Sequence, residues 1–120
     1  MRKLLPVLAA VASVGAIATG VAAAATPVQV VHLSAPASGL RYSQTVLHAH
    51  SGKIEIVFLN HAMMKHNVWV EKGETELGHS ATIGMGTTKF LVTLKAGSYN
   101  YYCSVPGHED AGMHGTLVVS

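Results

Sequence analysis

After residue 25, apolar and polar residues alternate in short runs, and no helical stripe of any length is present. Within residues 53–59, Ile54, Ile56 and Phe58 fall on one face, which is the two-residue period of a β-strand. Comparable runs predict seven strands, at residues 28–33, 43–48, 53–59, 67–71, 87–94, 98–103 and 115–119. Seven to eight short strands in one small domain predict an all-β fold, a Greek-key sandwich or barrel.

Glycine-containing turn signals separate these runs, as in Ser51-Gly52, Lys72-Gly73 and Ala96-Gly97. The segment 73–86 is the least regular part and is expected to be a loop with room for one short element. Trp69 is expected to lie in the core. Tyr102 is expected to face outward, because its strand parity is opposite to that of the residue after it.

Residues 1–25 predict a secretory signal peptide. Arg2 and Lys3 precede a stretch without charges that runs to Ala25 and ends in alanines. A basic head, an apolar stretch and a small-residue end are typical of a cleaved export signal. Cleavage after Ala25 would leave residues 26–120 as a single domain, periplasmic or otherwise exported. An uncleaved N-terminal anchor is the alternative, because the uncharged stretch approaches the length of a bilayer span.

Charge excludes some partners of this domain. Residues 26–120 carry six basic and six acidic side chains, so the formal net charge of +2 comes from the signal. A neutral domain offers no basic face to nucleic acid, and its partner is expected to meet an apolar surface. After signal cleavage no membrane insertion is expected, and a monomer is expected.

The only cysteine is Cys103, which excludes a disulfide within the chain. An exposed thiol in an exported protein would oxidise, so Cys103 is either buried and inert or protected by a metal. His108 and Met113 follow it at equal spacing, in a loop between two predicted strands. Such a loop can fold three donors around one ion. Thiolate, imidazole and a weak thioether suit copper, which alternates between two oxidation states.

A second imidazole is expected from His66, which lies at a predicted loop-to-strand boundary far from Cys103 in the sequence. Asn67, the next residue, can stiffen the site by bonding across to the Cys103 loop. A ligand from a distant strand would tie the two halves of the sandwich together.

Four features carry a family resemblance: His66-Asn67, Tyr99-x-Tyr101-x-Cys103, Cys103-x4-His108-x4-Met113 and Gly115-Thr116-Leu117. With them the chain resembles the cupredoxins, the small blue (type 1) copper proteins, and most of all the azurin, auracyanin and plastocyanin-like carriers. The resemblance implies that His66, Cys103 and His108 are the trigonal ligands of one copper ion and that Met113 is the axial ligand.

The resemblance also implies the surroundings of the copper. The backbone N–H groups of Asn67 and Val105 would donate to the Cys103 sulfur. Lys65 stands where azurin has glycine, so a close carbonyl contact with copper is not expected. An apolar docking patch around His108 would include Met64, Pro106 and Gly107.

The resemblance implies a soluble one-electron carrier rather than an enzyme. Its redox partners would dock near His108, and a c-type cytochrome, an oxidase or a reductase would each fit. The alternative is a periplasmic copper-handling protein without a dedicated electron-transfer role. The remaining histidines are left outside the site, and His48 with His50 is interpreted as a solvated pair on one strand face. These residues are His32, His48, His50, His61, His79 and His114.

Overall fold

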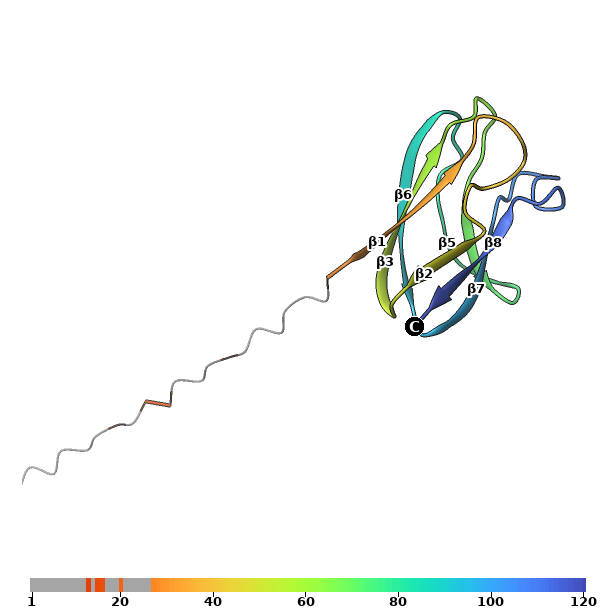
Figure 1. Ribbon diagram of the computed structural model, residues 1–120. Helices are drawn as coiled ribbons and strands as arrows, with labels where there is room; N and C mark the ends of the chain where they lie inside the picture. The colour runs from red at the N-terminus through yellow and green to blue at the C-terminus, as the bar shows by residue number, and fades with distance from the viewer. Residues whose placement is uncertain (1–12, 14, 17–19, 21–26) are drawn as a thin grey trace, which may run out of the picture.

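The computed structural model describes residues 13, 15–16, 20 and 27–120 (Figure 1). The signal peptide predicted for residues 1–25 falls almost entirely outside these residues and stays a prediction. The described part of the chain contains eight strands and no helix. The strands are β1 (Gln29–Ala35), β2 (Val46–Ala49), β3 (Gly52–Asn60), β4 (Trp69–Lys72), β5 (Thr75–His79), β6 (Gly86–Leu94), β7 (Gly97–Tyr102) and β8 (His114–Val119). The prediction of an all-β fold is confirmed.

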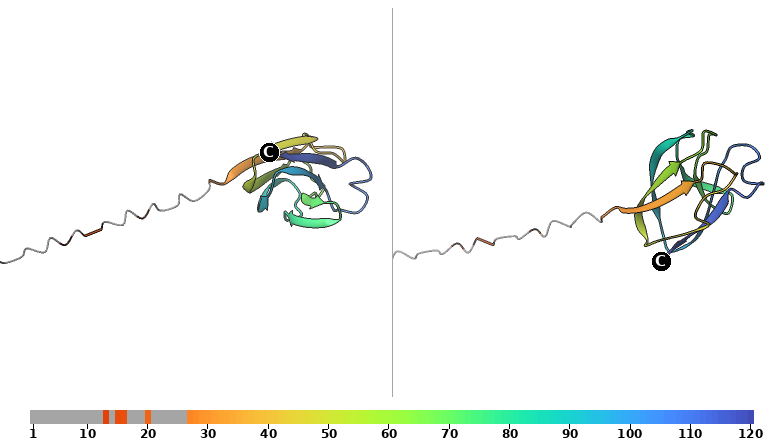
Figure 2. Two further views of the ribbon diagram at one scale, coloured as in Figure 1. Left: turned by 90° about the horizontal axis from the view of Figure 1, so that it is seen from below. Right: turned by 45° about the horizontal axis from the view of Figure 1, so that its top comes forward.

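The strands form two sheets that face each other as a sandwich (Figure 2). One sheet has the order β1-β3-β6 and the other has the order β2-β8-β7-β4-β5. The β1–β3 and β2–β8 pairs are parallel, whereas the other pairs are antiparallel. At the edges, β1 contacts β2 and β5 contacts β6, so the two sheets meet on both sides.

The core lies between the sheets and is built by strand alternation. Ile54, Ile56 and Phe58 of β3 point inward and are fully buried, as the sequence pattern predicted. Tyr42 bridges the layers, because its ring contacts Phe58 at a centroid distance of 5.8 Å and Tyr101 at 5.4 Å. Burying such aromatic rings supplies a large part of the hydrophobic stabilisation of a small domain.

Several strand bounds differ from the predicted ones. β2 begins at Val46 rather than at residue 43, and β4 begins at Trp69 rather than at residue 67. β5 is the one short element in the segment that was expected to be mostly loop. Residues 66–67 lie outside the regular strands and are held by hydrogen bonds to other loops. Their side chains take part in the site described below.

The prediction that Trp69 lies in the core is wrong. Val70 is the residue of β4 that points inward, so strand parity places Trp69 on the outer face, where it is half-buried. Its indole ring stacks on the imidazole of His79, with the ring centroids 4.5 Å apart. Tyr102, half-buried on the same face, lies 6.3 Å from Trp69 between ring centroids.

Candidate metal centre

The loop from Cys103 to Met113 joins β7 to β8 and folds back on itself. Met113 N–H donates to the His108 carbonyl (3.1 Å), and Cys103 N–H donates to the Met113 carbonyl (3.1 Å). Gly107 and Gly112 have φ of 83° and 116°, values that strain any residue with a side chain. These turns bring Cys103, His108 and Met113 to one place.

His66 reaches the same place from the other side. Its backbone forms an isolated bridge with Ile83, in which each N–H donates to the other carbonyl at 3.0 Å. The side chain of Asn60 secures this region, because its Nδ2 donates to the carbonyls of Met64 (2.9 Å) and Ile83 (2.7 Å). Two loops are therefore tied together directly around His66.

The donor atoms of His66, Cys103 and His108 converge. His66 Nδ1 lies 3.1 Å from His108 Nδ1, and Cys103 Sγ lies 3.5 Å from His108 Nδ1. All three donor atoms lie within 4.8 Å of one another, and within the described residues no other group of three histidine, cysteine or acidic side chains does so. His66 and Cys103 are fully buried, whereas His108 is 8% exposed. Met113 is also fully buried, next to this group in the core.

The donor set fits one metal ion. Metal bonds of about 2.0–2.3 Å to nitrogen and sulfur allow a single ion to reach donors at these separations. Burial lowers the pKa of His66, and the neighbouring His108 lowers it further, so the neutral imidazole that binds metals is favoured. With Nδ1 bound to a metal, His66 carries its proton on Nε2, which is buried and has no hydrogen-bond partner. A thiolate with two neutral imidazoles is a donor set that copper accepts.

The side chain of Asn67 links the two loops that carry the donors. Its Oδ1 accepts from the Ser104 N–H (2.8 Å), and its Nδ2 donates to the hydroxyls of Ser104 (2.8 Å) and Thr82 (2.9 Å). Tyr42 Oη donates to the Asn67 carbonyl at 2.6 Å. The expected bond from Asn67 across to the Cys103 loop is thus present.

Three of these partners were not found by sequence reasoning. Ser104 could have been suggested by its position next to Cys103, whereas Thr82 and Tyr42 carry no local signal. The predicted donation from the N–H groups of Asn67 and Val105 to the Cys103 sulfur stays a prediction.

The residues predicted to form the docking patch are exposed, and their joining into one patch around His108 stays a prediction. Pro106 and Gly107, which directly precede His108, are exposed, and Met64 is exposed as well. Lys65, between Met64 and His66, is exposed too.

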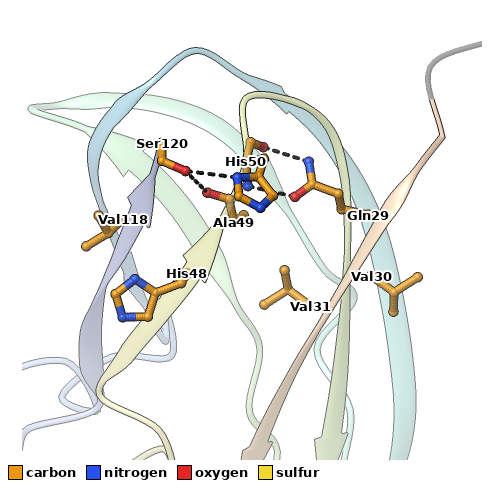
Figure 3. Close-up of a pocket in the computed structure, with 8 residues that line it drawn as sticks. All are labelled: Gln29, Val30, Val31, His48, Ala49, His50, Val118 and Ser120. Atoms are coloured by element: carbon orange, nitrogen blue, oxygen red, sulfur yellow. Dashed lines mark hydrogen bonds between the residues drawn. The ribbon is translucent and has the colours of Figure 1, made fainter.

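A further cavity lies at the opposite end of the sandwich and is separate from the donor group. It measures about 540 Å³ and lies between β1, β2 and the chain end after β8 (Figure 3). His50 follows the end of β2 and is turned toward Ser120, with 3.0 Å between its Nδ1 and Ser120 Oγ, while the His48 ring lies apart (Figure 3). Both histidines are exposed, in agreement with a solvated pair, but they do not share one strand face.

No helix in the described part of the chain is long and apolar enough to cross a membrane.

The comparisons agree with this geometry. A family model described as copper binding proteins of the plastocyanin/azurin family matches residues 29–120. No curated protein matches the chain. Among solved structures, auracyanin A, a "blue" copper protein from the green thermophilic photosynthetic bacterium Chloroflexus aurantiacus, is similar at a TM-score of 0.73 and 23% identity, over 78% of this chain and 100% of auracyanin A.

Two further structures have the same fold. Auracyanin B has a TM-score of 0.73 and 24% identity, over 80% of this chain and 91% of that one. Rusticyanin from Thiobacillus ferrooxidans has a TM-score of 0.67 and 17% identity, over 80% of this chain and 79% of that one. Because the family model covers most of the sequence, the chain belongs to the plastocyanin/azurin family of copper-binding proteins, with copper as its cofactor.

Proposed function

We propose that this protein carries one electron at a time between redox partners, on a type 1 copper held by His66, Cys103 and His108, with Met113 as the weak axial ligand. The observation that carries the proposal is the convergence of three buried donor atoms. The Nδ1 atoms of His66 and His108 and the Sγ atom of Cys103 lie within 4.8 Å of one another. Bound copper supplies a one-electron couple between its two oxidation states.

The residues around the donors favour electron transfer because they resist rearrangement. A carrier exchanges electrons quickly when its ligands need not move between the two oxidation states. The Asn67 side chain, with three hydrogen bonds, and the backbone bonds between Cys103, Met113 and His108 hold the ligand loops in one arrangement. Such second-shell contacts orient the ligands of a metal.

The burial of the donors favours a carrier over an enzyme or a copper-delivery protein. His66, Cys103 and Met113 are fully buried, so a metal ion held by them would be shielded from an external substrate. A closed set of four donors also favours retention of copper over its release.

The partner is proposed to dock near His108, the most exposed of the four donors at 8%. Met64, Pro106 and Gly107 would form the apolar docking patch. A c-type cytochrome, an oxidase or a reductase would each fit a neutral domain with such a patch. The contact would be small and short-lived, with about 1,200 Å² or less buried in total.

The proposed location is the periplasm or another exported compartment, reached through the signal peptide of residues 1–25. The single cysteine supports this proposal, because a thiol bound to copper is protected from oxidation outside the cytoplasm. The domain over residues 26–120 is proposed to act as a soluble monomer.

Absorption and electron spin resonance spectra of the copper-loaded protein test the function. We expect an intense blue band from the bond between thiolate and oxidised copper, and a reversible one-electron reduction. Cys103→Ser should abolish the blue band, whereas His48→Gln, which removes an exposed imidazole outside the donor group, should retain it. A protein that stays colourless after loading with oxidised copper would contradict the proposal.

A further inference from the structure

Three methionines lie on the surface at the end of the sandwich that holds the donor group. The exposed fraction is 86% for Met63, 56% for Met64 and 66% for Met85. Methionine is usually a core residue, so three large exposed thioethers are unusual in a domain of this size. Only Met113, the remaining methionine of residues 27–120, is buried.

The backbone brings these methionines into one neighbourhood. Met85 N–H donates to the Ala62 carbonyl at 2.8 Å. Gly84 lies so close to the preceding loop that a Cβ added to it would be 2.7 Å from the Met63 carbonyl oxygen. The two short loops that carry the methionines therefore lie against each other, and long flexible side chains on them can adapt to a shared ligand.

A cavity is shared by Met64, one of these methionines, and His66, one of the donor residues. It measures about 440 Å³ and is lined by Met64, Ala62, the turn at residues 37–40 and the buried ring of His66. The lining is mostly apolar and contains no carboxylate. The same His66 ring carries Nε2, a buried polar atom without a hydrogen-bond partner. Met64 is thus the thioether that stands between the surface and a proposed copper ligand.

We propose that Met63, Met64 and Met85 form a receiving site for Cu(I), from which the ion reaches the donor group past Met64 and His66. Thioether sulfur is a soft ligand that selects Cu(I), whereas hard divalent ions prefer the carboxylate oxygens that this cavity lacks. The exposed ammonium of Lys65 adds no ligand and disfavours a doubly charged ion more than a singly charged one. No covalent change is involved, because the ion exchanges one set of sulfur and nitrogen ligands for another.

The inference rests on the proposed copper ligands, and loading kinetics separate the two proposals. Apoprotein is mixed under anaerobic conditions with Cu(I) held by a small thiol, or in a second series with aqueous Cu(II). Samples are withdrawn, oxidised, and read at the blue absorption band. The variant Met63→Leu/Met64→Leu/Met85→Leu keeps the surface apolar and removes only the thioethers. Leu91→Met, which adds an exposed thioether on β6 outside the cavity lining, is the matched control.

We expect the triple leucine variant to load from Cu(I) about tenfold more slowly, taking the lower end of the roughly 10–100-fold losses of metal affinity that follow removal of groups around a metal site. Its loading from Cu(II), its final absorbance and its reduction potential should match those of the wild-type chain, and Leu91→Met should load at the wild-type rate. Equal Cu(I) loading rates in wild-type and triple-variant proteins that both turn blue would overturn this inference alone. A wild-type protein that never turns blue would overturn the proposed function and the inference together.

Discussion

The side chain of Asn67 is bonded twice to Ser104. Its Oδ1 accepts from the Ser104 backbone N–H, and its Nδ2 donates to the Ser104 hydroxyl, each at 2.8 Å. Asn67 follows His66, and Ser104 follows Cys103, so this pair of bonds joins two donor-bearing loops that lie far apart in the sequence. The carboxamide of Asn67 is therefore the direct side-chain link that sets the spacing between His66 and Cys103.

Replacing Asn67 with alanine should weaken copper binding while leaving the β-sandwich folded. We expect the affinity to fall by about 10–100-fold, since the ligands would lose the contacts that orient them. Competition with a copper chelator measures this change. Thr82→Val, which removes only one of the three hydrogen bonds of the Asn67 side chain, should have a smaller effect. Equal copper affinities for Asn67→Ala and the wild type would show that the hydrogen bonds of the Asn67 side chain do not position the ligands.

Replacing Tyr42 with phenylalanine should lower the free energy of unfolding by about 1–3 kcal/mol, because the Asn67 carbonyl would lose the hydroxyl that donates to it. Chemical denaturation of the apoprotein measures this cost. The aromatic packing on Phe58 and Tyr101 should persist in the variant. A cost near zero would mean that water replaces the lost donor.

The same variant should also change the stability at alkaline pH. Burial raises the pKa of Tyr42 above its ordinary value of 10.0. The folded state thus holds the proton more tightly than the unfolded state, and stability that is complete below pH 10 is lost as the pH rises further. We expect the stability lost between about pH 9 and pH 11 to be smaller in Tyr42→Phe. Parallel pH profiles for the two proteins would contradict this.

Gly115→Ala, in β8, should destabilise the fold more than Gly78→Ala, in β5. A Cβ at Gly115 would collide with the ring of Tyr101 and lie 2.6 Å from the Thr45 carbonyl oxygen. Overpacking of this kind costs about 1–3 kcal/mol or more. Gly78→Ala is the control, because its Cβ would meet Phe90 at an ordinary 3.4 Å. Similar melting temperatures for the two variants would argue against this packing.

Copper should stabilise the protein against heat. An ion that binds only the folded state, at a free concentration about 100 times its Kd, adds about 2.7 kcal/mol to the free energy of unfolding. Differential scanning calorimetry with and without copper measures the shift. Cys103→Ser, which lacks the thiolate, should shift much less. If the melting temperature of the wild-type protein is the same with and without copper, the metal binds outside the folded core.

Pro106→Glu should slow electron exchange with a c-type cytochrome without changing the blue absorption. Pro106 is exposed two residues before His108, so a carboxylate there would put charge into the proposed docking patch. A charge at the rim of an interface acts mainly on the association rate. Stopped-flow kinetics measure the rate, and Leu91→Glu on β6 is the control. An unchanged rate for Pro106→Glu would place the docking surface elsewhere.

The sequence by itself determined the fold class and the local part of the metal centre. The alternation of residues such as Ile54, Ile56 and Phe58 is a property of neighbouring positions, and strand geometry converts it directly into a buried face. Cys103, His108 and Met113 lie within one loop, so their spacing alone indicates that they can meet. His66 and the bond from Asn67 to the Cys103 loop were predicted from position and chemistry.

The tertiary structure decided what depends on contacts between distant segments. Trp69 lies outside because Val70 faces the opposite sheet, a choice of parity that no property of Trp69 reveals. Ser104 and Thr82 bond to Asn67 only because two loops, 37 and 15 residues away from it, fold against it. The two loops that carry the three exposed methionines likewise meet through the close approach of Gly84 to Met63. Such relationships arise from chain packing, and a linear pattern records only which residues are available to take part in it.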